Sequence, residues 1–266
     1  MRSLGILLLA AVAVRSQEPA PAASPAVIPP LLNTGAPLVL PFRCTMQDIQ
    51  SGGLSCSEEE PCPVYLELAA VASSGIRIFA AGNIHTANAT LYSVLLGTED
   101  NGQTWKEVHE RIPAAGLDHI QFSGADMGWS SGISLAPLPQ DPFLLMTTDG
   151  GKSWRARPIF NEPRFGTIQQ FYFEDKRAGE LVIDHGPGSG NDRYELYESN
   201  DGGETWNIRE TNLKPLRLKR APLAPNPDWR VRADAPSKSF HLEHRQAGKW
   251  TSIAAFQVNL TPCKPE

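Results

Sequence analysis

The sequence has no excess of positive charge and no apolar run long enough to cross a bilayer. Lys and Arg number 24 against 29 Asp and Glu, so the formal net charge is -5 at pH 7. A nucleic-acid-binding protein presents a basic surface that neutralises phosphates, and this balance argues against that class. The apolar run at residues 4–14 is shorter than the roughly 20 residues that a membrane-spanning helix needs. We therefore expect no nucleic-acid partner and no integral membrane span.

Motifs for metals and cofactors are also missing. The four cysteines lack the paired CxxC spacing of zinc sites, which leaves zinc as the weaker alternative to disulfides. The Gly-rich residues 186–190 are not followed by the Lys-Ser/Thr of a phosphate-binding loop. The six histidines are scattered along the chain without a metal-type pair. We expect no cofactor and no metal.

The N-terminus is typical of a targeting signal. Arg2 precedes the apolar run, and Val14-Arg15-Ser16 offers small residues at the positions that a signal peptidase reads. The alternative is a buried core helix. Residues 17–37 are rich in Pro and Ala and predict an extended or disordered linker. We expect a signal peptide at 1–16, a linker at 17–37 and a domain at 38–266, hence an exported protein, periplasmic or secreted.

The four cysteines suit an oxidising compartment. Three of them cluster at the start of the domain and one lies near its end. Four cysteines allow three pairings, which sequence alone cannot distinguish. We favour a local bond between Cys56 and Cys62, and a clasp between Cys44 and Cys263 that joins the two ends of the domain.

One octapeptide recurs three times, at residues 98–105, 147–154 and 199–206. All copies obey Ser/Thr-x-Asp-x-Gly-x-Ser/Thr-Trp, and their aspartates are 49 (149 minus 100) and 52 (201 minus 149) residues apart. This period is typical of propeller blades. The Asp, Gly and Trp of the three boxes are Asp100, Gly102, Trp105, Asp149, Gly151, Trp154, Asp201, Gly203 and Trp206.

The chemistry of the box is that of a hairpin turn. The Asp carboxylate accepts backbone N–H groups, the Gly tolerates positive φ, and the hydroxyls close further hydrogen bonds. The Trp then buries its ring under the turn. A calcium loop is the alternative, but each box has too few oxygen ligands for it. We therefore expect the boxes to be structural.

Short β-rich runs surround each box, at about four per repeat. A fourth unit begins with residues 216–219 and ends at residues 246–250, which keep Gly and Trp but not Asp, as in a degenerate box. The apolar residues 38–43 form a spare strand that can complete the last blade and close the ring. We predict an all-β fold, a small β-propeller of about four four-stranded blades. Five blades, a partly open ring or pairing with a second copy are the alternatives.

At the boxes the sequence resembles the BNR/Asp-box repeat propellers, a group that includes sialidases and sortilin-type receptors. Residues 126–132, with Gly-Trp-x-x-Gly, and the box at 147–154 look closest to the photosystem II assembly-factor-like members. The resemblance covers residues 64–212 and implies the fold, whereas function depends on individual sites. The chain is shorter than seven-bladed members, so no binding surface is carried over.

A sialidase needs an arginine cluster, a Tyr–Glu nucleophile pair and an acidic proton donor. Phe42-Arg43-Cys44 only echoes that family's Phe/Tyr-Arg-Ile-Pro motif, because Ile-Pro is missing. We keep a sialidase-like glycan hydrolase as the alternative function. Arg43, Arg77 and Arg193 gathered at one pocket beside a Tyr–Glu contact would favour it.

The best candidate for partner binding is a basic stretch in a net-acidic chain. Residues 214–232 contain one acid, Asp228, and six basic residues, which are Lys214, Arg217, Lys219, Arg220, Arg230 and Arg232. Such a contrast attracts acidic partners, although a charged edge strand that prevents aggregation is the simpler interpretation. We expect an exported, non-enzymatic propeller that binds a protein or a component of the cell envelope.

Overall fold

The structure, a computed structural model, describes residues 29–136, 140–219, 227–259 and 261–264. The expected signal peptide at 1–16 lies outside the described residues. The described residues are nearly all β, with one short helix, α1 (Met46–Ser51), and one 3-10 turn, η1 (Gly190–Asp192). Among the described residues, no helix has the length and apolar character to span a membrane.

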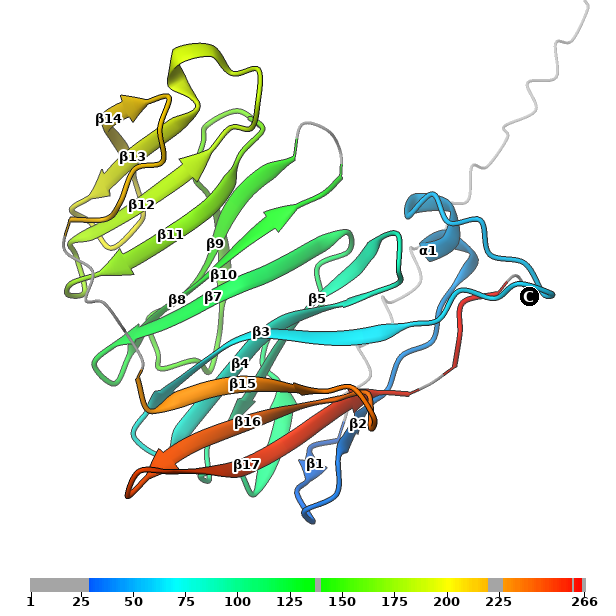
Figure 1. The fold of residues 1–266 in the computed structure, drawn as a ribbon. Helices are drawn as coiled ribbons and strands as arrows, with labels where there is room; N and C mark the ends of the chain where they lie inside the picture. Colours follow the sequence, from blue (N-terminus) through cyan, green and yellow to red (C-terminus); the bar gives the residue numbers. More distant parts are fainter. Residues whose placement is uncertain (1–28, 137–139, 220–226, 260, 265–266) are drawn as a thin grey trace, which may run out of the picture.

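The strands form four sheets, which we call blades 1 to 4 in chain order (Figure 1). Blade 1 contains β3 (Tyr65–Ser74), β4 (Arg77–His85), β5 (Thr90–Thr98) and β6 (Thr104–Glu107), with β1 (Leu31–Leu32) added beyond β6. Blade 2 contains β7 (Ala115–Ser123), β8 (Met127–Ser134), β9 (Asp141–Thr147) and β10 (Arg155–Pro158). Blade 3 contains β11 (Thr167–Phe173), β12 (Gly179–Asp184), β13 (Tyr194–Ser199) and β14 (Asn207–Asn212). Blade 4 contains β15 (Trp229–Asp234), β16 (Ser239–Gln246), β17 (Lys249–Val258) and β2 (Leu38–Leu40).

The blades are arranged as a small propeller, in agreement with the fold class expected from the repeats. The first strand of each blade lies on the inner side, where β3 packs against β7 of blade 2 and against β15 of blade 4. Middle strands such as β4 are buried on both faces because another blade covers each side, and β4 is accordingly a nearly continuous run of small and apolar residues.

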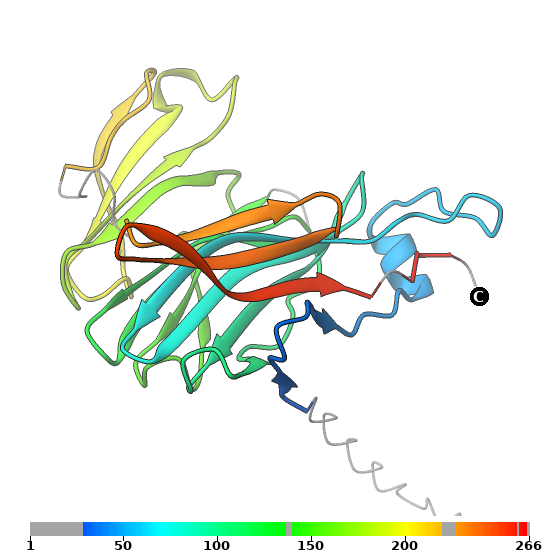
Figure 2. The ribbon, with the colours of Figure 1, turned by 60° about the horizontal axis from the view of Figure 1, so that its bottom comes forward.

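The blades follow one another in an arc rather than a closed ring. Blade 4 packs on blade 1, blade 1 on blade 2, and blade 2 on blade 3. Blades 3 and 4 lie at the two ends of the arc, as both views show (Figures 1 and 2). Of the alternatives left open by the sequence, the described residues therefore adopt the partly open one.

Each Asp box fastens its blade to a neighbouring blade of the arc. The Trp105 ring of the first box meets Phe256 of blade 4, with centroids 5.0 Å apart. The Trp154 ring of the second box meets Phe79 of blade 1 at 6.0 Å. In the third box, the carbonyl of Gly202 accepts a hydrogen bond of 2.8 Å from the indole N–H of Trp129 in blade 2. The boxes are thus contacts between blades as well as turns.

Blade 3 lacks the aromatic residue that receives the next box in blades 1 and 2. Phe79 of β4 lies opposite Gly97, and Trp129 of β8 lies opposite Met146. These are equivalent register positions, each on the second strand of its blade. The residue at this position in blade 3 is Glu180, opposite Glu198. The Glu180 side chain accepts a hydrogen bond of 2.9 Å from the backbone N–H of Lys219 instead. Residues 213–219 therefore lie on this face of blade 3, where the sequence had suggested a strand at 216–219.

The N-terminal segment completes blade 4. β2 pairs with β17 in parallel, with Leu38 opposite Phe256 and Leu40 opposite Val258. Cys44, a few residues further on, is bonded to Cys263, and Cys56 is bonded to Cys62. These are the two pairs that we favoured from the sequence. The added strand completes the last blade as expected but does not close the ring.

The linker expected at 17–37 is wrong for its described part. β1 pairs with β6, and the Asn33 side-chain amide donates to the carbonyls of Gly102 and Ile253 at 2.8 Å each. This asparagine ties the first box to blade 4, because its side-chain amide donates to one carbonyl from each of them. The described part of the domain therefore includes β1 and begins before residue 38.

The degenerate box expected at residues 246–250 is also wrong. The three boxes join the third and fourth strands of their blades, whereas residues 246–249 form the turn between β16 and β17, the second and third strands. Ala247 and Gly248 both have positive φ, 47° and 78°, as in a two-residue type I′ hairpin. Because the fourth strand of blade 4 comes from the N-terminus, this blade has no connection in which an Asp box could form.

Candidate binding site

The Asp-box carboxylates are occupied by their own turns. In the first box, the Thr104 hydroxyl and backbone N–H donate to Asp100, and the Thr98 hydroxyl also donates to it. These bonds lower the pKa of Asp100 to about 2. In the second box, burial raises the pKa of Asp149, but hydrogen bonds from Ser153 and its neighbours outweigh that effect and lower it to about 2. Residues with these structural tasks are poor candidates for binding or catalysis.

No group of three or more His, Cys, Asp or Glu side chains with the geometry of a metal site occurs within the described ranges. The boxes are not exceptions, because each uses one carboxylate and the oxygens of that carboxylate already accept the hydroxyls and N–H groups of the turn.

The structure divides the basic stretch between two blades. Lys214, Arg217 and Lys219 are exposed on the segment that lies on blade 3, and the Lys219 ammonium is 3.4 Å from Glu210. Arg230 and Arg232 lie on β15 of blade 4. Arg220 lies outside the described residues. The five described residues therefore do not form one continuous run on a single element.

Arg230 and Arg232 are brought together by a residue that the sequence analysis did not single out. Both guanidinium groups donate to the carboxylate of Glu243 on β16, at 2.6 and 2.7 Å. The Glu243 side chain is 8% exposed, whereas those of the two arginines are 44% and 42% exposed. Burial raises the pKa of Glu243, but the two arginines outweigh it and lower the pKa below its usual value.

A tryptophan and a third arginine extend this group. Trp250 lies opposite Arg245 across the β16–β17 hairpin. The guanidinium carbon of Arg230 is 4.3 Å from the Trp250 ring centroid, and that of Arg245 is 5.7 Å from it. Such distances are those of cation–π contacts. Arg245 also pairs with Asp228 at 3.1 Å and remains 44% exposed.

All these side chains share one face of blade 4, which we call the arginine face. Its members are Arg230, Arg232, Glu243, Arg245 and Trp250. The alternate residues of the same strands, Val231, Leu242 and Phe256 among them, belong to the core that blade 4 shares with blade 1. Because neighbouring residues in a strand point to opposite faces, the arginine face is directed away from blade 1, at the end of the arc.

The sequence did contain a signal for this face. The two-residue turn at Ala247-Gly248 fixes the register, which places Trp250 opposite Arg245. Interpreting residues 246–250 as a degenerate box hid that pairing, because a box would have placed the tryptophan under the turn between two other strands. The tryptophan belongs to the face rather than to the core.

The three arginines that would favour a sialidase are held in different places. Arg77 on β4 donates to the backbone carbonyls of Gly150 and Ala125 in blade 2. Arg193 in blade 3 pairs with Asp184 at 3.0 Å. Arg43 follows β2 and lines a hollow of about 480 Å³ beside Arg111. Arg77 and Arg193 thus have structural partners of their own on different blades.

A tyrosine–glutamate contact with an arginine is present elsewhere, inside blade 3. The hydroxyl of Tyr197 donates to Glu195, which also accepts from Arg164 at 2.9 Å and lies 2.7 Å from a ring nitrogen of His185. The Glu195 side chain is 3% exposed. Burial raises the pKa of Glu195, but hydrogen bonds from Tyr197, Arg164 and His185 outweigh it and lower the pKa. This arrangement is a packed network whose carboxylate already has several partners.

No family model matches the sequence, and no curated protein matches it. Among solved structures, YCF48 bound to a D1 peptide aligns with a TM-score of 0.36 at 18% identity, over 72% of this chain and 53% of that chain. YCF48 from Cyanidioschyzon merolae aligns with a TM-score of 0.36 at 18% identity, over 76% of this chain and 57% of that chain. A GH74 xyloglucanase from Xanthomonas campestris aligns with a TM-score of 0.37 at 14% identity, over 68% of this chain and 27% of that chain. The chain thus spans little more than half the length of the YCF48 structures that it matches.

Proposed function

We propose that this protein is an exported, non-enzymatic scaffold that binds an acidic segment of a protein partner through the arginine face of blade 4. The observation that carries the proposal is the gathering of Arg230, Arg232 and Arg245 around Trp250 on a sheet face that points away from the neighbouring blade. Two disulfides support the export part of the proposal, because such bonds persist in oxidising compartments.

The chemistry of this face suits carboxylates. A guanidinium presents a planar fork of donors that matches a carboxylate oxygen pair, and arginine holds this charge at any physiological pH. Tryptophan and arginine are also the residues most enriched among those that carry binding energy in protein interfaces. The face therefore combines apolar area with directed positive charge.

The buried carboxylate of Glu243 prepares the face for binding. It holds Arg230 and Arg232 side by side, so less conformational entropy is lost when a partner arrives. Arg230 and Arg232 share the single carboxylate of Glu243, and Asp234 also acts on Arg232 electrostatically, so the guanidinium groups outnumber the carboxylates that they contact directly. An acidic segment would supply carboxylates to the exposed parts of these guanidinium groups.

The proposal is tested by retention on the immobilised, disulfide-bonded protein. The test variant carries Arg230→Gln, Arg232→Gln and Glu243→Gln together, so that no buried carboxylate is left without its arginines. The control variant carries Arg209→Gln and Lys219→Gln, which remove two exposed charges from blade 3. Proteins of the native envelope fraction, polyglutamate and anionic phosphatidylglycerol vesicles are applied separately at low and at high salt.

We expect wild type and control to retain a protein ligand and polyglutamate at low salt, and the test variant to lose both by tenfold or more. Equal retention by the test variant would place the partner elsewhere on the molecule. Retention of vesicles alone would replace the protein partner by a membrane surface. Turnover of a fluorogenic sialoside by the wild-type protein would overturn the non-enzymatic part of the proposal.

A further inference from the structure

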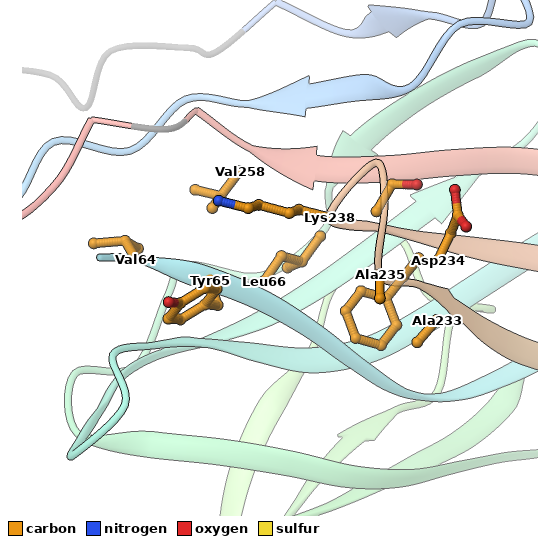
Figure 3. A pocket seen from close by; sticks show the side chains of 10 residues that line it. Val64, Tyr65, Leu66, Ala233, Asp234, Ala235, Lys238 and Val258 are labelled. Atoms are coloured by element: carbon orange, nitrogen blue, oxygen red, sulfur yellow. The ribbon is translucent and has the colours of Figure 1, made fainter. Parts of the chain in front are cut away.

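An apolar groove lies where blade 4 meets the inner strand of blade 1 (Figure 3). One side is the start of β3, with Val64 just before it and Leu66 within it, and the other is the hairpin between β15 and β16, with Ala235 and Phe240. Its volume is about 340 Å³, near the lower end of the roughly 300–1,000 Å³ of small-molecule sites. The groove is distinct from the arginine face, which lies on the other side of the same blade.

The polar groups of the hairpin tip beside the groove are already engaged with one another. The Asp234 carboxylate accepts a hydrogen bond from the Ser237 hydroxyl. The Ser239 hydroxyl lies 2.7 Å from that of Ser237 and 3.3 Å from a ring nitrogen of His241. These contacts hold the hairpin tip and leave few hydrogen-bonding groups for a ligand. The groove therefore suits a chain of apolar groups rather than a polar molecule.

Lys238 brings a positive charge to this site. Its backbone has a φ of 51°, and its N–H donates to the Ala235 carbonyl at 3.3 Å, so the tip of the hairpin is held in one conformation. Figure 3 shows the Lys238 side chain extended along the groove, with its ammonium toward Val64 and Val258. In the part of the chain that the structure describes, this ammonium has no ion-pair partner within 4 Å. The apolar groove thus ends at an unneutralised positive charge.

We propose that this groove binds a medium-chain fatty acid, with the alkyl chain along Leu66 and Phe240 and the carboxylate at the Lys238 ammonium. An alkyl chain brings no polar group into a lining that is almost entirely apolar, and each buried methylene contributes to affinity. The carboxylate supplies the charge that Lys238 lacks.

An extended peptide fits these observations less well. Each residue of a peptide carries a backbone N–H and a C=O, and burying either without a partner costs free energy. The groove offers few partners, because the serine and aspartate groups of the hairpin tip are engaged within the tip. A single carboxylate at one end of an apolar chain meets the charge and the lining together.

The proposal is tested by displacement of the fluorescent fatty acid 11-(dansylamino)undecanoate from the purified, disulfide-bonded protein. The competitors are octanoate, decanoate, dodecanoate, dodecanol, and a pool of hexapeptides with Val, Leu, Ile, Phe or Ala at the last four positions. Lys238→Met removes the charge, Ala235→Trp fills the groove, and Lys214→Met is the matched control on blade 3. Circular dichroism verifies that each variant is folded.

We expect dodecanoate to bind at micromolar concentration, with affinity rising about two- to fourfold per added methylene. Lys238→Met should weaken dodecanoate tenfold or more and leave dodecanol unchanged, Ala235→Trp should weaken both, and Lys214→Met neither. The proposal is overturned if no fatty acid displaces the probe, if Lys238→Met binds dodecanoate like wild type, or if only the peptide pool competes. Dodecanoate affinity that is unchanged in Ala235→Trp would show that the chain binds outside the groove and would overturn it equally.

Discussion

The indole of Trp154 meets the ring of Phe79 edge to face, although the two residues belong to different blades, with ring centroids 6.0 Å apart. The indole N–H donates to the Gly151 carbonyl of its own box at 3.2 Å, and Phe122 packs against another edge at 5.8 Å. At Gly151, φ is +87° and an added Cβ would lie 2.3 Å from Phe79, so only glycine lets the turn approach so closely. The box therefore joins blade 2 to blade 1 through its glycine and its tryptophan.

Replacing Trp154 by Ala should lower the free energy of unfolding by about 3–5 kcal/mol, as for other buried large aromatic residues. The side chain is only 9% exposed and its loss would leave a cavity between two blades. Urea unfolding followed by circular dichroism measures the change. Trp250→Ala is the matched control and should cost clearly less, because Trp250 lies on the arginine face and not between blades. Similar losses for both variants would mean that the contact of the box tryptophan between blades adds no stability of its own.

Acid should weaken the Asp boxes within a defined pH range. The pKa values of Asp100 and Asp149 are lowered from 3.8 to about 2. A carboxyl whose pKa is lower in the folded protein stabilises it above the unfolded pKa, and that stabilisation is lost as the pH falls through the folded pKa. The contribution of the boxes should thus be complete above about pH 4 and decline toward pH 2.

The measurement is the melting temperature of wild type and of Asp149→Asn between pH 7 and pH 2. Asn cannot ionise, so its hydrogen bonds to the turn are weaker at neutral pH but do not change with acid. The difference between the two proteins should be constant from pH 7 to about pH 4.5 and then shrink. A difference that persists unchanged to pH 2 would show that ionisation of Asp149 does not stabilise the turn.

Glu180 should hold the segment that covers the open end of blade 3. Its carboxylate is buried and accepts the backbone N–H of Lys219 at 2.9 Å. Glu180→Ala removes this acceptor, so trypsin should cleave after Arg217 and Lys219 several-fold faster than in wild type. Glu180→Gln keeps an acceptor at the same place and should cleave almost as slowly as wild type. Equal rates for all three proteins, measured by mass spectrometry of the fragments, would exclude the role of Glu180.

The repeat and the blades could be predicted from the sequence because the Asp box is a local structure. Asp149 contacts residues no more than four positions away, so its hydrogen bonds are encoded in one octapeptide. The loss of the aromatic residue in blade 3 is seen instead only when Glu180 is aligned with Phe79 and Trp129 on the second strands of the other blades. That alignment was available in the sequence, but its meaning depends on contacts between blades that only the structure shows.

The arginine face was only half predictable. Arg230 and Arg232 are visible in the sequence as basic residues in a net-acidic chain. Their buried partner Glu243 lies on β16 and the ring of Trp250 on β17, and the sequence analysis singled out neither contact. Residues 246–250 were assigned to the wrong connection because one strand of blade 4 comes from a distant part of the sequence. The fourth strand of blade 4 is Leu38–Leu40, more than 200 residues away in the sequence from the strand with which it pairs, and no local pattern specifies that pairing.

The clasp between Cys44 and Cys263 should stabilise the domain more than the bond between Cys56 and Cys62. The first closes a loop with a sequence separation of 219 residues, and the second a loop with a separation of 6. In the chain-entropy model, the longer loop restricts the unfolded chain by about 5 kcal/mol and the shorter by about 2 kcal/mol. The clasp also holds β2 in place on β17, so its loss exposes the apolar edge of blade 4.

The comparison uses Cys44→Ser with Cys263→Ser against Cys56→Ser with Cys62→Ser, unfolded in urea under non-reducing conditions. We expect the first pair of substitutions to lower the free energy of unfolding by up to about 5 kcal/mol and the second by about 2 kcal/mol. Hydrogen exchange should localise the first effect to Leu38–Leu40 and Lys249–Val258, because β2 is released from β17 when its anchor is cut. A larger loss from the short loop would show that the clasp is not what keeps the N-terminal strand in blade 4, and that the backbone pairing of β2 with β17 suffices.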